Sequence, residues 1–231
     1  MRLQTALKLG RVSNLPTVWT NVLAGVGLAA LEPPWRVVLP VGAAVSVLYV
    51  AGTYLNDAFD AGWDAQHRAE RPIPAGEVSA RVVFQAGFGM MAAALILLAV
   101  ATTTGALVAG VVLAGLIVLY DASHKDNRFA PALLGLCRVA VYGVAASATG
   151  SFAPPVAVGA LFLFGYLVTL SAIARQETKN PKLRRLVGRL IAGISLVDGV
   201  QLVAVGHAWL AVVCVGAFGL TLALQKRVAG T

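Results

Sequence analysis

The chain has 231 residues, of which 58% are hydrophobic and only 12% are charged, and its mean hydropathy is +0.81. This composition excludes an ordinary soluble domain and is typical of a protein with many membrane-spanning helices. The net charge of +8 comes mostly from Lys and Arg outside the apolar runs, so it indicates membrane topology and attraction to anionic lipid, and we expect no nucleic-acid partner.

Apolar runs long enough to cross a lipid bilayer predict about eight transmembrane helices, in a single domain over residues 1–231. The runs lie near residues 14–31, 36–55, 80–101, 104–120, 131–150, 155–174, 186–206 and 208–225. Lys and Arg gather at both ends of the chain and in the connections at 56–79, 121–130 and 175–185, whereas the other connections hold almost none. The positive-inside rule therefore predicts an all-α polytopic bundle in a plasma membrane, with both termini in the cytoplasm.

The most informative segment follows the second apolar run, where residues 56 to 64 read Asn-Asp-Ala-Phe-Asp-Ala-Gly-Trp-Asp. On a helix at about 100° per residue, Asn56, Asp60 and Asp64 fall on one face roughly 80° wide, so that their oxygens can converge on one ion. Asp57 points about 100° away from Asn56. Oxygen ligands of this kind, together with a substrate phosphate, suit Mg²⁺. We therefore predict that Mg²⁺ is bound by Asn56, Asp60 and Asp64.

The same loop continues with basic residues and prolines up to a helix start at Ser79. Arg68 and Arg71 are placed to take phosphate oxygens in a fork, beside a metal that takes the others. The alternative is a solvated loop of ordinary mixed charge.

The second loop reads Tyr-Asp-Ala-Ser-His-Lys-Asp-Asn-Arg over residues 120 to 128. Lys125 and Arg128 could complete an anion site, although an isolated loop lysine is usually solvated. His124 could serve as a base, but a histidine on a surface is the commoner case.

The third loop begins at Arg175 and contains a single carboxylate, Glu177. Glu177 could be the sole protein ligand of a second metal ion, or simply the partner of Arg175. The sequence favours neither interpretation.

Two ionisable residues lie within the apolar runs. Arg138 is about two turns into the fifth run, and Asp198 is near the middle of the seventh. Because such residues are costly in lipid, we expect both to face the interior of the bundle. They could pair with each other, or line a polar cavity and contact the substrate.

These motifs resemble those of the UbiA superfamily of intramembrane prenyltransferases. The resemblance is carried by Asn56, Asp60 and Asp64 and by the Arg-Pro-Ile-Pro-Ala-Gly stretch at residues 71–76. It extends to residues 8–20, which resemble the start of the family's first helix, and to Tyr120, Asp121 and Lys125, which resemble its basic second cytoplasmic loop.

The resemblance implies a helical bundle around a central cavity that opens to lipid, commonly with nine spans. Family members join the prenyl group of a polyprenyl diphosphate to a lipophilic, typically aromatic, acceptor. Two Mg²⁺ ions bridge the diphosphate, and an allylic cation forms before the acceptor attacks. The candidate site comprises Asp60, Asp64 and Lys125 as catalytic residues, Asn56 and Glu177 as further metal ligands, and Arg68, Arg71, Arg128, Arg138 and Asp198 as further substrate-binding residues.

The chain departs from the family in its length and in its third loop. The loop reads Ala-Arg-Gln-Glu-Thr-Lys from Ala174, where a second Asp-rich motif is expected, and it retains only Glu177. Either Glu177 and basic residues suffice for a Mg²⁺-dependent transfer, or the protein binds or transports isoprenoid lipids without catalysis. A terpenoid cyclase, which ionises the diphosphate without an external acceptor, is a third possibility.

Overall fold

The computed structural model describes residues 1–30, 34–125, 127–176, 181–228 and 230. Within these residues the chain is helical and contains no strand, which confirms the predicted all-α class. Glu177, the candidate metal ligand of the third loop, lies outside the described residues.

The helices begin and end close to the predicted boundaries. Near the N-terminus lie α1 (Leu3–Leu9), a 3-10 helix (Val12–Asn14) and α2 (Leu15–Ala29). The others are α3 (Trp35–Phe59), α4 (Ala61–His67), α5 (Ala80–Ala101), α6 (Thr104–Ser123), α7 (Ala130–Ala148), α8 (Pro154–Ala174), α9 (Pro181–Ala204) and α10 (Ala208–Gln225).

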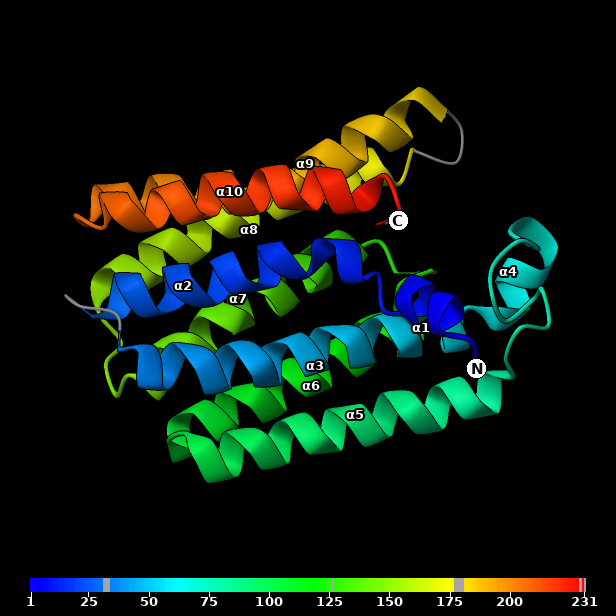
Figure 1. Ribbon diagram of the computed structural model, residues 1–231, viewed down its shortest axis with the longest axis horizontal. Helices are drawn as coiled ribbons and strands as arrows, with labels where there is room; N and C mark the ends of the chain where they lie inside the picture. Colours follow the sequence, from blue (N-terminus) through cyan, green and yellow to red (C-terminus); the bar gives the residue numbers. More distant parts are fainter. Residues whose placement is uncertain (31–33, 126, 177–180, 229, 231) are drawn as a thin grey trace.

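Seven of the described helices, α3 and α5 to α10, are long and apolar enough to cross a membrane. The eighth predicted span corresponds to α2, which has only 15 residues yet lies in the bundle between α3 and α10 (Figure 1). Its residues are almost all buried, so α2 is surrounded by protein rather than by lipid. The predicted count of about eight is thus met by seven long helices and one shorter central helix.

Close packing of α2 against α7 depends on a small residue. A Cβ atom added to Gly25 would lie 2.7 Å from the Cβ of Ala145 and 3.0 Å from the Cα of Tyr142. Glycine and alanine allow membrane helices to approach closely, where van der Waals contact is a main source of their association. Gly25 therefore brings the polar residues of α2 within reach of α7.

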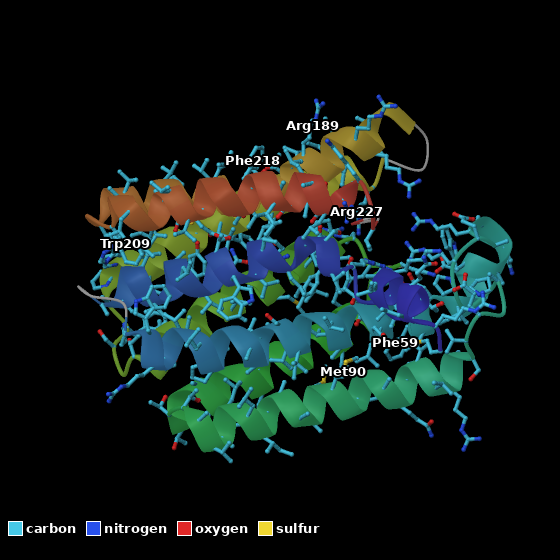
Figure 2. The ribbon with its side chains drawn as sticks, in the orientation of Figure 1. Phe59, Met90, Arg189, Trp209, Phe218 and Arg227 are labelled. Atoms are coloured by element: carbon cyan, nitrogen blue, oxygen red, sulfur yellow. The ribbon has the colours of Figure 1, made fainter. Side chains whose placement is uncertain are left out.

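The charged residues and both chain ends gather at one end of the bundle. Figure 1 shows the N- and C-termini at the end where α1 and α4 lie. In Figure 2, Phe59 and Arg227 lie toward this end and Trp209 lies at the opposite one. There the Trp209 ring packs against Trp35, with ring centroids 6.1 Å apart, as expected for aromatic residues at a membrane surface.

Candidate active site

A cavity of about 1310 Å³ opens among the helices at the charged end of the bundle. Its apolar wall is formed by residues of α2, α3, α6, α7, α8 and α9: Val18, Val45, Leu48, Leu113, Ile117, Leu134, Val141, Leu167, Ile191 and Ile194. Its mouth is lined by charged and amide side chains: Lys8, Arg11, Asn56, Asp57, Asp60, Arg68, Glu70, Arg71, Asp121, His124, Lys125, Arg128, Arg175 and Arg184. The cavity therefore has an apolar interior and a highly polar mouth.

The first motif spans the junction of α3 and α4, yet it keeps helical spacing. The Asp60 N–H donates to the Asn56 carbonyl at 2.9 Å, and the Asp64 N–H donates to the Asp60 carbonyl at 2.9 Å. Because these bonds continue the i to i−4 pattern, the three side chains stay near one face, as predicted. Asn56 and Asp60 line the cavity, whereas Asp64 lies behind this lining and is only 1% exposed.

Asp57 is held by two arginines from different parts of the chain. Its Oδ1 lies 2.8 Å from Arg11 Nη2 and 2.6 Å from Arg71 Nη1. Arg11 has φ 40° and ψ 44°, a left-handed conformation that is uncommon for a residue other than glycine. This turn after α1 directs the guanidinium at α3, and such backbone strain is often found at functional sites.

Asp60 is held by the second loop, which supports the predicted proximity of Lys125 to the first motif. Asp60 Oδ1 lies 2.9 Å from Lys125 Nζ, and Oδ2 lies 3.4 Å from His124 Nε2. Burial raises the pKa of Asp60, but hydrogen bonds with His124 and Lys125 lower it below its usual range. Burial lowers the pKa of His124, and the Asp60 carboxylate raises it above its ordinary value. Each partner thus favours the charged form of the other.

Asp64 lacks such a partner. Neither of its carboxylate oxygens has a hydrogen bond, and the nearest cation is Arg71, whose Nη1 lies 3.8 Å from Oδ2. Burial raises the pKa of Asp64, because the charged form is removed from water without a close counter-charge. An added cation would relieve this cost.

The amide of Asn56 is fixed from both sides. Arg11 Nη2 donates to Asn56 Oδ1 at 2.9 Å, and Asn56 Nδ2 donates to Asp121 Oδ1 at 3.2 Å. An arginine can only donate and a carboxylate can only accept, so the two neighbours require the same amide orientation. Asp121 is 5% exposed, and its Oδ2 is buried without a hydrogen bond.

Other cations complete the mouth of the cavity. Lys125 Nζ and the Arg68 guanidinium lie over the Trp63 ring, 4.5 and 5.5 Å from its centroid. Arg128 lies 4.7 Å from the centroid of Phe129, and Arg175 donates to the Asn127 carbonyl at 2.7 Å. The predicted residues Arg68, Arg71, Lys125 and Arg128 are thus brought together at one mouth.

Arg138 lies deeper in the cavity than the acidic motif. Its Nη1 donates to Asn21 Oδ1 at 2.8 Å, its Nη2 donates to Thr17 Oγ1 at 3.1 Å, and it lies 5.4 Å from the centroid of the Tyr49 ring. Arg138 lines the cavity wall, eight residues into α7. At 1.5 Å per residue, this places it about 12 Å from the start of that helix.

Asp198 is buried behind the cavity wall, with 0% exposure. Both of its oxygens accept from Asn21 Nδ2, at 3.1 and 2.9 Å, and Oδ1 also accepts from the Tyr142 hydroxyl. The two predicted intramembrane ions are therefore connected, with the Asn21 amide between them.

The residues at the mouth suit a divalent cation, although its ligands are not gathered in advance. Among the described residues, no three His, Cys, Asp or Glu side chains are grouped closely enough to hold a metal ion. Asp57 and Asp60 are instead held by cationic side chains of the protein itself. Both oxygens of Asp64 and the Oδ2 atom of Asp121 are buried without a hydrogen bond, and carboxylate oxygens are the hard ligands that Mg²⁺ prefers.

Comparison with known proteins agrees with this architecture. The model of the UbiA prenyltransferase family matches residues 17–226, most of the chain. The chain belongs to the UbiA prenyltransferase family. This confirms the resemblance inferred from the first motif and its Arg-Pro tail.

Two relatives within the UbiA family show its range. A 4-hydroxybenzoate octaprenyltransferase from Idiomarina loihiensis is 31% identical over 123 residues, which cover 52% of this chain and 42% of that protein. A digeranylgeranylglyceryl phosphate synthase from Methanoregula boonei is 38% identical over 94 residues, which cover 40% of this chain and 33% of that protein. The matched segments thus span less than half the length of these curated relatives.

Solved UbiA structures share the fold. A structure described for a digeranylgeranylglyceryl phosphate synthase in membranes has a TM-score of 0.67 at 19% identity, covering 97% of this chain and 88% of that one. A UbiA homologue from Archaeoglobus fulgidus, bound to DMAPP and Mg²⁺, has a TM-score of 0.65 at 15% identity, covering 98% and 88%. At these identities the likeness establishes the fold.

The two side chains that contact the Asn56 amide, Arg11 and Asp121, were absent from the predicted site. Arg11 is 45 positions from Asn56, and in the sequence it indicates only a basic N-terminus. Asp121 contributed to the family resemblance, but no spacing linked it to the first motif. Asp121, like Asp60, is a carboxylate at the end of an apolar run, and this position was the signal in the sequence that could have identified it as a site residue.

Proposed function

We propose that this protein transfers a prenyl group from a polyprenyl diphosphate to a lipophilic acceptor, typically an aromatic one, within the membrane. The observation that carries the proposal is the arrangement of the cavity, whose apolar wall ends at a mouth that holds both acidic oxygens and many cations. The wall suits an isoprenoid tail, and the mouth suits a diphosphate with its metal. The UbiA homologue from Archaeoglobus fulgidus, bound to DMAPP and Mg²⁺, supports this assignment.

In this proposal, Asn56, Asp60 and Asp64 hold Mg²⁺, and Arg68, Arg71, Lys125 and Arg128 bind the diphosphate. When bound, Mg²⁺ supplies Lewis-acid stabilisation of the charge that develops on the leaving diphosphate. Lys125 and Arg71 add fixed positive charge at the same place. The C–O bond to the diphosphate breaks with its electron pair leaving on oxygen, the acceptor attacks the allylic carbon, and the attacking atom of the acceptor then loses its proton to the released diphosphate. The apolar wall protects that carbon from water.

Arg138 is proposed to contact the substrate from the cavity wall, and Asp198 is proposed to act through Asn21 by holding Arg138 in place. We also propose that the charged end of the bundle faces the cytoplasm of a cell with this protein in its plasma membrane. The clustering of Lys and Arg at this end supports that orientation.

The test is release of pyrophosphate from geranyl, farnesyl and geranylgeranyl diphosphates by the protein in lipid, with Mg²⁺ or EDTA. A pool of quinone precursors and other lipophilic acceptors is added or withheld. We expect acceptor-dependent release that requires Mg²⁺ and is lost in Asp60→Ala. Glu77→Gln is the control, because this carboxylate is exposed and accepts from the Thr5 hydroxyl at 2.6 Å, outside the cavity lining.

The outcomes separate the three activities that the sequence left open. Release without an acceptor would indicate a cyclase. Tight binding of all the diphosphates without any release would indicate a lipid-binding or transport protein and would overturn the proposal.

A further inference from the structure

Asp121 is a buried carboxylate at the cavity that the proposed reaction has not used and that, unlike Asp57, has no ion pair with a cationic side chain among the described residues. It lies near the C-terminal end of α6, and α6 packs against α3, which carries Asn56 and ends beside Asp60. Asp121 lines the cavity and is 5% exposed. Burial of a charged group is costly unless it is paired, so each of its oxygens needs a partner.

One oxygen of Asp121 has a partner that belongs to the metal site. Asp121 Oδ1 accepts from Asn56 Nδ2 at 3.2 Å. Because a carboxylate cannot donate, this bond turns the amide nitrogen toward α6 and the amide oxygen away from it. Groups that orient a metal ligand in this way commonly affect metal affinity as strongly as 10- to 100-fold.

The other oxygen of Asp121 has no hydrogen-bond partner. Asp121 Oδ2 is buried without a hydrogen bond, although the side chain lies on the cavity wall. The same helix end supplies His124 and Lys125, both of which contact Asp60. Asp121 and Asp60 are therefore at one junction, where α6 meets the end of α3.

We propose that Asp121 is a further carboxylate of the divalent-cation site: Oδ1 orients the Asn56 amide, and Oδ2 is left for the cation. The inference rests on the proposed function, and it assigns a ligand outside both the first motif and the third loop. The third loop contains only one carboxylate, Glu177, and Asp121 would supply the site with a further negative charge from α6.

The experiment is a titration of the purified protein in lipid with Mn²⁺, in which free Mn²⁺ is followed by electron paramagnetic resonance. Asp121→Asn keeps the size of the side chain but removes its charge, and we expect it to weaken Mn²⁺ binding about 10- to 100-fold. Glu77→Gln also removes one carboxylate at the charged end of the bundle, and it is expected to leave the Mn²⁺ affinity unchanged. An Asp121→Asn affinity within twofold of the wild type would overturn the proposal.

A second pair of variants covers the case in which Asp121→Asn does not fold. Asp121→Glu and Asp121→Gln have side chains of equal length, and only Glu retains the charge. Binding of Mn²⁺ that is at least tenfold tighter in Asp121→Glu supports the proposal, and equal binding contradicts it. Wild-type protein and Asp60→Ala are titrated in parallel. If the wild type does not bind Mn²⁺, the proposed metal site as a whole is wrong. If Asp60→Ala loses Mn²⁺ binding while the Asp121 variants keep it, the metal site stands and the role of Asp121 is wrong.

Discussion

Arg138 on α7 and Asp198 on α9 are joined through the side-chain amide of Asn21 on α2. The Asn21 oxygen accepts from Arg138 at 2.8 Å, and its nitrogen donates to both Asp198 oxygens. The neutral Asn21 amide thus connects the positive charge of Arg138 to the negative charge of Asp198, and these hydrogen bonds join α2, α7 and α9. The arrangement also holds the guanidinium at the cavity wall.

The first prediction concerns this connection. Asn21→Ala removes one hydrogen-bond partner from each of two buried charged groups, Arg138 and Asp198, and we expect a loss of about 1–3 kcal/mol in the free energy of unfolding. Thermal melting of the protein in detergent measures the change. Thr169→Ala is the control, because the Thr169 hydroxyl is exposed and donates at 2.9 Å to the Gly165 carbonyl of its own helix. Equal melting temperatures for wild type and Asn21→Ala would contradict a stabilising role for the amide.

The second prediction concerns the close approach of α2 and α7. Gly25→Ala places a methyl group 2.7 Å from Ala145 Cβ, so we expect overpacking to cost about 1–3 kcal/mol. The same change at Gly165 meets no atom within 4 Å and is expected to be neutral or stabilising, because alanine favours a helix. Melting of both variants separates packing from helix propensity, and a Gly25→Ala protein as stable as Gly165→Ala would refute the packing argument.

The third prediction separates the two roles of Lys125. Because Lys125 Nζ lies 2.9 Å from Asp60 Oδ1, the lysine competes with a metal for that oxygen. If the proposed site is correct, Lys125→Met should bind Mn²⁺ alone up to about tenfold more tightly and bind a prenyl diphosphate about tenfold more weakly, each the size of one charge-assisted hydrogen bond.

Both affinities for the Lys125 variant can be measured on one preparation, by Mn²⁺ titration and by displacement of a labelled diphosphate. Arg81→Met, which removes an exposed cation outside the cavity lining, is the control. Loss of both affinities together would show that Lys125 is needed for the structure of the site rather than for charge balance.

The fourth prediction is a pH dependence of stability in EDTA, from the Asp60–His124 contact. The pKa of His124 is raised in the folded protein, so its contribution is complete below the unfolded pKa and is lost as the pH rises through the folded one. The pKa of Asp60 is lowered, so its contribution is present above the unfolded pKa and is lost as the pH falls through the folded one. The contact therefore stabilises most between about pH 4 and 6.5.

We expect the melting temperature of His124→Gln to fall below that of the wild type by the largest margin across this range, and by less at alkaline pH. His67→Gln is the control, since His67 is exposed on α4 and contacts a backbone carbonyl. A His124→Gln deficit that grows as the pH rises would reverse the sign and contradict the assignment.

Much of the fold followed from the order of apolar residues along the chain. Long apolar runs can satisfy their backbone hydrogen bonds in lipid only as helices or closed barrels, and their length selects helices. The exception was α2, which has only 15 residues and is shorter than its apolar run predicted. Most of its residues are buried against other helices, so it does not need the length of a helix that faces lipid.

The spacing of Asn56, Asp60 and Asp64 also determined their shared face, because successive i to i+4 positions lie close on a helix regardless of the rest of the protein. Only the tertiary structure decided what surrounds them. Arg11 and Asp121 reach Asn56 from segments 45 and 65 residues away. Likewise, the link from Arg138 to Asp198 depends on Asn21, which spacing could not connect to either. Such contacts depend on how helices pack against one another, and packing is a property of three-dimensional surfaces rather than of local sequence.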